Sequence, residues 1–218
     1  MTIDVRSFPF YSALAEEERK LLDTSLREHC FAQGAQVHGG ECTGLLLVKE
    51  GRLRAYTMSE EGREITLYRL ERGDVCLLSA SCVLKGLQVD LFISAETAAR
   101  IFLLPAEVYR RLAERSAAVS SFANELMARR FSEVMWVLSE VLNKKFDARL
   151  AALLVKEADY AGGEEVRLTH EQLAGHLGTV REAVSRMLKY FEREGYVSLF
   201  RGGVRIRDFA ALRALANN

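Results

Sequence analysis

The residues best suited to chemistry lie near the C-terminus, on one face of a helix predicted at Val180–Glu194. That face carries four polar side chains: Arg181, Glu182, Ser185 and Arg186. An arginine can donate two hydrogen bonds to O6 and N7 of guanine, and a carboxylate can accept one from N4 of cytosine. Because these base edges are exposed in the major groove of DNA, the pattern predicts a helix that reads base sequence.

The segment before this helix determines how its polar face is presented. Thr169 is predicted to be the N-cap of a first helix, and Gln172, three residues later, completes a capping box. Gly178 supplies the tight turn between the two helices, and Thr179 is predicted to cap the second. The apolar side chains expected to face inward are Leu173, Leu177, Val184, Leu188 and Phe191. Two short helices joined by a glycine turn are typical of a helix-turn-helix motif.

The residues after the second helix are predicted to form a two-stranded wing. Tyr196–Phe200 is strand-like, Arg201–Gly203 is a turn, and Val204–Arg207 alternates apolar and basic residues. Such a wing places arginines against DNA phosphates. The alternative is a helical hairpin that makes protein contacts and has an ordinary solvated, charged face. On the first interpretation, the DNA contacts are Thr169, His170, Thr179, Arg181, Glu182, Ser185, Arg186, Lys189, Arg201 and Arg205.

Charge is unevenly distributed along the chain, although the formal net charge of the whole sequence is zero. Residues 167–218 hold nine Lys and Arg against five Asp and Glu, an excess of four positive charges. Residues 1–166 carry the balancing negative excess. A basic C-terminal quarter on an acidic body favours a polyanionic partner for that end of the chain.

Residues 30–105 have a different character, because glycines separate short apolar or alternating runs. The runs are Leu45–Val48, Leu53–Met58, Ile65–Leu70, Leu91–Ser94 and Arg100–Leu104. Ser59–Gly62 is predicted to be a hairpin turn between two of them. Short strands at regular spacing predict an antiparallel barrel or roll. A helix is expected before it, from Ser12 to about His29, and another after Pro105.

A long helix is predicted over 118–145, because the chain from Ala106 to Lys145 contains no glycine or proline. At roughly 1.5 Å per residue this helix extends about 42 Å, which is too long for one small roll to cover. Steps of four and three residues define an apolar stripe: Met127, Phe131, Val134, Leu138 and Val141. This coiled-coil-like spacing favours a dimerisation helix, and the alternative is packing wholly within one subunit. A further helix is expected at Ala148–Tyr160, capped by Asp147.

Composition excludes several classes of protein. Apolar residues make up 49% and charged residues 28%, which is typical of a globular chain rather than a disordered one. No apolar run approaches the roughly 18 residues of a membrane span, and Met1–Tyr11 lacks the apolar core of a secretory signal. The four cysteines, at positions 30, 42, 76 and 82, show no zinc-ligand spacing. We therefore expect a cytoplasmic protein without a catalytic site or a metal site.

A β-roll, a long helix and a winged helix-turn-helix, in this order, resemble the Crp/Fnr superfamily of bacterial transcription regulators. The most specific stretch is Leu168–Arg207, in which Arg181, Glu182, Ser185 and Arg186 match the family's Arg/Val-Glu-x-x-Ser/Gly-Arg pattern. The resemblance implies an α+β fold with an N-terminal antiparallel β-roll of the cyclic-nucleotide-binding type, a long dimerisation helix and a C-terminal winged helix-turn-helix. It implies a sensory domain at 1–117, a dimerisation helix at 118–145 and a DNA-binding domain at 146–218.

The same resemblance implies partners and a mode of action. It implies a homodimer that binds double-stranded DNA at pseudo-palindromic sites and contacts RNA polymerase. It also implies an effector, sensed in the roll, that reorients the two recognition helices to the roughly 34 Å separation of one DNA turn.

The expected sensor differs from that of the family's cyclic-nucleotide binders. Those proteins carry Gly-Glu-Leu after a Gly-Asp turn, and an Arg-Ser/Thr pair about ten residues later. Here Gly73-Asp74 is followed by Val75-Cys-Leu-Leu-Ser79, and no arginine lies between Arg72 and Arg100. Because a cyclic phosphate would lack its guanidinium partner, this segment argues against cAMP as the effector.

Other sensors are alternatives. The candidate effector residues are Cys76, Leu77, Leu78, Ser79 and Cys82. The two thiols could respond to oxidation, or both could be inert and buried. Heme held by His38 or Cys76 is a second alternative, and an iron–sulfur cluster held by these cysteines together with Cys30 and Cys42 is a third. An enzyme with Cys76 as nucleophile is the alternative from another class.

Overall fold

The computed structural model describes residues 4–39, 43–83 and 90–217, and at residues 5 and 81–83 it describes the course of the backbone alone. The chain divides into two compact units. Unit 1 comprises Met1–Thr57 and Leu67–Val134, and unit 2 comprises Met58–Thr66 and Met135–Asn218. The expected boundaries at 117/118 and 145/146 stay a prediction.

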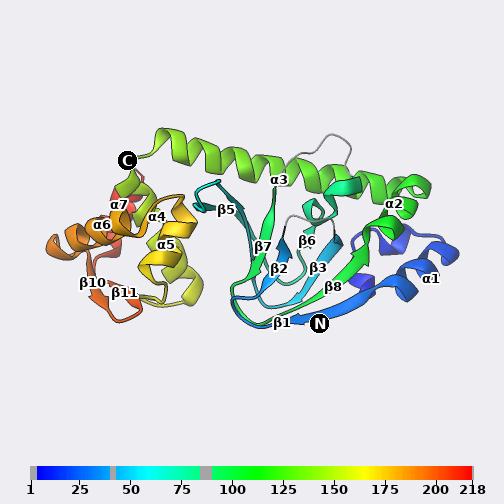
Figure 1. Cartoon of the computed structure of the whole chain (residues 1–218), viewed down its shortest axis with the longest axis horizontal. Coiled ribbons are helices and arrows are strands. Elements are labelled where there is room, and N and C mark those ends of the chain that lie inside the picture. Colours follow the sequence, from blue (N-terminus) through cyan, green and yellow to red (C-terminus); the bar gives the residue numbers. More distant parts are fainter. Residues whose placement is uncertain (1–3, 40–42, 84–89, 218) are drawn as a thin grey trace. The chain divides into compact units, whose positions relative to one another are not determined.

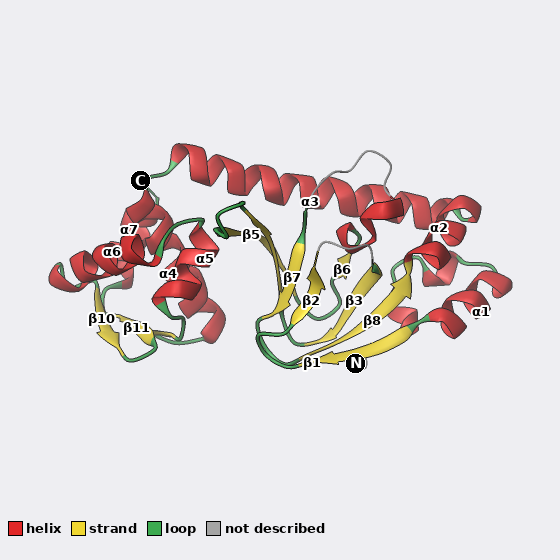
Figure 2. Ribbon diagram, in the orientation of Figure 1, coloured by secondary structure: helices red, strands yellow, loops and turns green. Residues whose placement is uncertain are grey.

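The N-terminal part of the described chain contains two four-stranded antiparallel sheets (Figures 1 and 2). One has the strand order β1-β8-β3-β6, and the other has the order β2-β7-β4-β5. The strands are β1 (Arg27–Phe31), β2 (Gln36–Gly39), β3 (Gly44–Glu50), β4 (Leu53–Met58), β5 (Glu64–Leu70), β6 (Val75–Cys76), β7 (Phe92–Ala95) and β8 (Ala99–Pro105). The predicted antiparallel roll is confirmed, and all five predicted runs fall on strands except for Leu91, which precedes β7.

The continuous apolar run in β3 is explained by burial on both faces of the strand. Successive side chains of a strand point to opposite sides. Leu45 and Leu47 lie in one buried cluster, together with Leu22 of α1 (Glu16–Ser25). Leu46 and Val48 lie in a second cluster. The core of unit 1 therefore has two parts, with β3 between them.

The N-terminal helix of unit 1 is shorter than expected at both ends. The first α-helix begins at Glu16 and ends at Ser25, and His29 lies in β1 rather than in a helix. A short turn of 3-10 helix, η2 (Tyr11–Ala13), replaces the predicted helical start at Ser12. Arg27 to Phe31 extend because they pair residue by residue with β8, so a long-range ladder decides their conformation.

The glycine-free stretch after the roll forms two helices. They are α2 (Ala106–Arg115) and α3 (Ala117–Asn143), separated at Ser116, which has an extended backbone. Pro105 ends β8 and is the N-cap of α2, as its fixed φ favours. Val119, Ala123 and Leu126 of α3 recur every three or four residues and are buried against the core of unit 1. Figure 1 shows α3 as one continuous helix.

Unit 2 contains the C-terminal helices and a three-stranded sheet of order β10-β11-β9. Its elements are α4 (Phe146–Ala161), β9 (Glu165–Val166), α5 (His170–Leu177), α6 (Arg181–Arg193), β10 (Val197–Phe200), β11 (Gly203–Ile206) and α7 (Phe209–Ala216). The predicted cap at Asp147 is wrong, because α4 begins two residues earlier than expected, with Lys145 as its N-cap. The Asp147 side chain instead accepts a hydrogen bond from the N–H of Ala148 at 2.9 Å.

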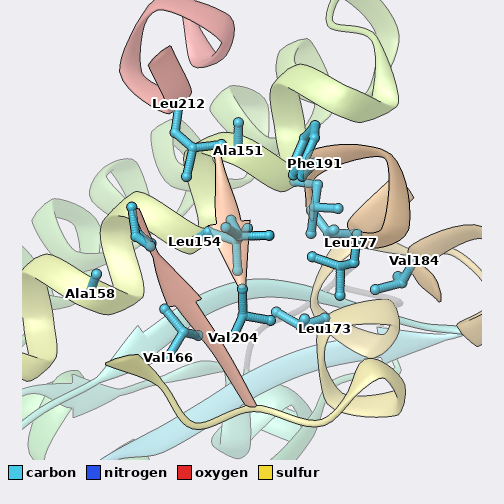
Figure 3. Close-up of a cluster of buried hydrophobic side chains, with 14 of the residues drawn as sticks. Ala151, Leu154, Ala158, Val166, Leu173, Leu177, Val184, Phe191, Val204 and Leu212 are labelled. Atoms are coloured by element: carbon cyan, nitrogen blue, oxygen red, sulfur yellow. The ribbon is translucent and has the colours of Figure 1, made fainter. Parts of the chain in front are cut away.

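One buried cluster joins all of these C-terminal elements (Figure 3). Leu154 of α4, Leu173 of α5 and Phe191 of α6 point into it together with Val204 of β11 and Leu212 of α7. The five side chains come from five elements, and each is fully buried. The orientation of α6 is therefore fixed by its apolar face.

Candidate DNA-binding surface

The capping box at the start of α5 is confirmed. The Thr169 side chain accepts a hydrogen bond from the N–H of Gln172 at 3.2 Å. In return, the Gln172 side chain accepts one from the N–H of Thr169 at 2.8 Å. At the other end, Gly178 has φ +69° and ends the helix in the left-handed conformation that favours glycine.

The predicted cap at Thr179 is wrong. The N-cap of α6 is Val180, and no side chain caps this helix. The N–H of Thr179 donates to the carbonyl of Ala174 at 3.1 Å, which completes the turn that ends α5. Because Thr179 still belongs to that turn, α6 starts one residue later than the sequence suggested.

The faces of α6 are separated by polarity. Val184, Leu188 and Phe191 are fully buried. The exposed polar residues up to Lys189 are Arg181, Glu182, Arg186 and Lys189, and the last two residues of the helix, Glu192 and Arg193, are exposed as well. Arg181 lies seven residues before Leu188, in line with the buried residues, and is exposed because it begins the helix. Since a helix turns about 100° per residue, Glu182, Arg186 and Lys189 lie on the side away from the core. Ser185 lies on the same side and is half-buried.

A contact that the sequence did not indicate connects α5 with this polar face. His170, the first residue of α5, has its Nδ1 atom 2.8 Å from Oγ of Ser185. Burial, together with the positive charge of Arg181, lowers the pKa of His170. The imidazole is thus favoured in its neutral form, and it fixes the Ser185 hydroxyl in the middle of the predicted reading face.

Two predicted wing arginines have different surroundings. Arg201 is exposed in the turn between β10 and β11. Arg205 on β11 pairs directly across the sheet with Glu165 on β9 and forms an ion pair with it. The other oxygen of Glu165 lies 2.9 Å from the Arg167 guanidinium. Glu165 was not among the predicted site residues, although the acidic pair Glu164-Glu165 shortly before α5 is visible in the sequence.

The apolar stripe of α3 is exposed over its C-terminal part. Met127 is half-buried and packs against both clusters of unit 1. Phe131, Leu138 and Val141 are exposed, and Val134 is half-buried. Two further apolar side chains on this side are exposed as well: Met135 and Leu142. Of the predicted dimerisation residues, only Met127 packs against both buried clusters of its own roll.

The candidate effector segment is built into the core of unit 1. Cys76, Leu77, Leu78 and Ser79 are all buried. The Ser79 hydroxyl donates to the carbonyl of Gly44 at 2.6 Å, or to that of Cys76 at 3.1 Å. The side chain of Cys82 and all of Cys42 lie outside the described residues.

The cysteine and histidine candidates do not assemble a metal site in the described part of the chain. Cys30 is exposed on β1, whereas Cys76 is buried, and both are free thiols. His38 is buried, with Nδ1 3.2 Å from Oγ1 of Thr43. Among the described residues, no group of three or more His, Cys, Asp or Glu side chains is placed to hold a metal ion.

A buried arginine near Cys76 was also missed. The Arg130 guanidinium lies 4.4 Å from the centre of the Tyr68 ring, and the Tyr68 hydroxyl lies 3.7 Å from Sγ of Cys76. The Arg130 guanidinium donates to the Val75 carbonyl at 3.3 Å and forms an ion pair with Glu133 at 2.7 Å. Its position on α3 continues the buried series of Val119, Ala123 and Leu126, a spacing that could have identified it.

No helix among the described residues is both long and apolar enough to cross a membrane. Even α3, the longest, carries charged residues along its length.

Comparison with known proteins agrees with this architecture. The family model of the Crp-like helix-turn-helix domain matches residues 148–215. The solved structure of a candidate Crp/Fnr-family transcriptional regulator from Eubacterium rectale is 44% identical, covers 98% of this chain and 100% of its own, and has a TM-score of 0.95. The cyclic AMP receptor protein of Thermus thermophilus is 28% identical over 214 residues, 97% of this chain and 98% of that protein. The anaerobic regulatory protein of Aggregatibacter actinomycetemcomitans is 25% identical over 214 residues, 93% of this chain and 82% of that protein. The chain belongs to the Crp/Fnr family of transcription regulators, which bind DNA through a helix-turn-helix domain and are not enzymes.

Proposed function

We propose that this chain is a homodimeric regulator that recognises a specific duplex sequence by placing α6 in the major groove. The observation that carries the proposal is the division of α6 into a buried apolar face and an exposed polar face. Arg181, Glu182 and Arg186 are exposed in the first half of the helix, from which recognition helices contact base edges. The arginines would donate to guanine, and Glu182 would accept from cytosine.

The other predicted contacts would bind DNA phosphates and so position α6 on the duplex. Thr169 and His170 lie at the N-terminus of α5, where free backbone N–H groups favour a phosphate. Lys189 lies farther along α6, and Arg201 lies at the tip of the wing. Thr179 and Arg205 complete the predicted set. Contacts to phosphates fix the register of a protein on DNA, whereas contacts to bases supply the specificity.

The exposed stripe of α3 supports a second copy of this chain as the partner. Apolar residues at alternating steps of four and three form the contact line of a parallel two-stranded coiled coil. Phe131, Leu138 and Val141 would be covered by the same residues of the partner. A two-fold dimer presents two α6 helices to half-sites one DNA turn apart, which explains why we expect a pseudo-palindromic site.

Selection from random duplexes, followed by titration of variants, tests the DNA-binding proposal. A selected site and a scrambled duplex of equal length are titrated by fluorescence anisotropy. Arg186→Ala should lower the ratio of specific to nonspecific affinity by about 5- to 150-fold, because it removes a base contact. Lys189→Ala is the matched control: it should weaken both duplexes alike and reduce the salt slope by about one. An unchanged ratio in Arg186→Ala contradicts the assigned role.

We further infer that the roll senses a signal other than cAMP through Cys76–Ser79, in the place where nucleotide binders carry their cassette. Two observations support this inference. The segment is buried, with its serine hydroxyl bonded to backbone carbonyls, and the buried Arg130 is already paired with Glu133. We also propose that this regulator contacts RNA polymerase and is located in the cytoplasm.

A visible absorption spectrum of protein purified without oxygen distinguishes the sensor types. A Soret band indicates heme, and a broad absorption indicates an iron–sulfur cluster. A colourless protein whose DNA affinity changes with peroxide in wild type but not in Cys76→Ser supports thiol sensing. Adding cAMP should leave the DNA affinity unchanged, and a tightening by cAMP contradicts the inference.

A further inference from the structure

The acidic residue Glu165 holds two arginines at the base of the wing. Its side chain is 31% exposed, and the Arg205 side chain is 42% exposed, so the pair is accessible to a ligand. One carboxylate oxygen pairs with Arg205 and the other with Arg167. The hydrogen bond from Arg205, followed by the interactions with Arg167, lowers the pKa of Glu165. The carboxylate is therefore ionised at neutral pH.

The backbone keeps this arrangement in place. Glu165 and Arg205 are direct partners in the antiparallel pairing of β9 with β11, and Val166 pairs with Val204 beside them. Val166 and Val204 are buried in the core of unit 2. Because the strands are anchored by these neighbours, the backbone holds Glu165 opposite Arg205, and only the two side chains must be ordered to form the pair.

A carboxylate and a phosphate compete for the same guanidinium donors. Both accept the paired N–H groups of an arginine in a planar, bidentate manner. An arginine that is already neutralised by a carboxylate releases little free energy when a phosphate approaches. It also contributes less to the counterion release that produces salt-dependent DNA binding.

Resting on the proposed DNA-binding function, we propose that Glu165 restrains the affinity of the wing for DNA by occupying Arg205 and Arg167, the cations that phosphates would otherwise engage. Glu165 thus lowers the affinity of the protein for DNA phosphates. The wing then contributes mainly through Arg201 and Arg207, which are exposed, so specificity depends on α6 rather than on backbone attraction.

The test compares Glu165→Gln with a matched control in the full chain. Glu164→Gln removes the same charge at the adjacent, exposed position, while the ion pairs of Arg205 and Arg167 are both made with Glu165. Binding to a scrambled duplex is titrated between about 50 and 300 mM salt. Glu165→Gln should tighten binding about three- to tenfold at the lowest salt and steepen the salt slope by about one to two, since each additional phosphate contact adds about 0.9. Glu164→Gln should leave the slope unchanged.

A double-mutant cycle identifies the arginine concerned. Arg205→Ala should weaken binding less in the wild-type background than in the Glu165→Gln background, where it should remove most of the gain. Arg201→Ala should cost the same in both backgrounds, because Arg201 lies in the turn, away from β9. Equal effects of Glu165→Gln and Glu164→Gln would overturn the proposal, and so would weaker binding by Glu165→Gln. Circular dichroism melting verifies that each variant is folded.

Failure of this proposal is distinguishable from failure of the proposed function. If the wild type binds DNA and Arg186→Ala reduces its specificity while Glu165→Gln changes nothing, Glu165 has no such role. If neither the wild type nor any variant binds duplex DNA in a salt-dependent manner, the DNA-binding proposal itself fails.

Discussion

Phe131 provides the most sensitive test of the proposed dimer. Its side chain is 67% exposed on the single chain. Fully burying a phenylalanine stabilises by about 1.5–3 kcal/mol, so covering the exposed two thirds contributes about 1–2 kcal/mol. A two-fold dimer covers the residue twice, and Phe131→Ala should therefore destabilise it by about 2–4 kcal/mol. This corresponds to an increase of about 30- to 700-fold in the dimer Kd.

Trp136 is the matched control for this substitution. It is 61% exposed and has the larger side chain. It lies five positions from Phe131 and is thus rotated by about 140° around α3, whereas Leu138 lies within about 20° of Phe131. If exposure alone determined the effect, Trp136→Ala would be the more damaging change. If the apolar stripe forms the interface, Trp136→Ala should leave the dimer Kd within about twofold of wild type.

Sedimentation velocity over a range of protein concentrations measures the dimer Kd of each variant. Phe131→Leu, which keeps an apolar side chain, should lose less than Phe131→Ala. Circular dichroism must show equal helix content, so that loss of the dimer is not mistaken for loss of α3. Equal Kd values for wild type and Phe131→Ala refute the assignment, as does a larger loss in Trp136→Ala.

Three further predictions concern the C-terminal unit. Thr169→Ala should lower the free energy of unfolding by about 1 kcal/mol, as measured by urea denaturation, because it removes half of the capping box, whereas Thr169→Ser should keep most of it. Gly203→Ala should lower the free energy of unfolding by about 1–3 kcal/mol, because a Cβ there meets the Val166 carbonyl oxygen at 2.6 Å. Gly163→Ala is the control, because a Cβ at Gly163 meets nothing within 4 Å, and equal losses for the two variants contradict the steric argument. Because burial lowers the pKa of His170, the unfolded state binds protons more readily than the folded state below about pH 6.5, so stability should fall as the pH drops. His170→Gln should show a smaller loss between pH 7.5 and 5.5, and an equal loss contradicts this reasoning.

Features determined by neighbours in sequence could be predicted from the sequence. The capping box at Thr169 and Gln172 spans one helical turn, and the buried apolar face of α6 follows from helical periodicity. The run in β3 is apolar because both of its faces are buried, and such a run can be recognised without knowing its partners. Local chemistry and periodicity were sufficient for these elements.

Features that depend on distant pairing could not be predicted in this way. Arg27–His29 continue a helical pattern in sequence, but pairing with β8 makes them part of a strand. Arg130 donates to a carbonyl 55 residues away, and Arg205 pairs with an acid 40 residues away. The segment between Arg72 and Arg100 therefore gave no sign of the guanidinium that α3 places against the carbonyl of Val75. Sequence spacing does not reveal which charges the fold brings together.

The ion pair at Glu165 also changes what the charge distribution means. Counted from residue 167, the C-terminal part has nine basic and five acidic residues, and this excess favoured a polyanionic partner. Glu164 and Glu165 lie just outside that window, although β9 belongs to the same unit. Counted from residue 164, the acidic residues number seven and the excess falls to two. Arg167 and Arg205 contribute to the count but face a carboxylate. The case for DNA binding therefore depends on where α6 places its exposed side chains rather than on net charge. Long-range attraction should be modest, and most of the discrimination should arise from direct contacts to bases.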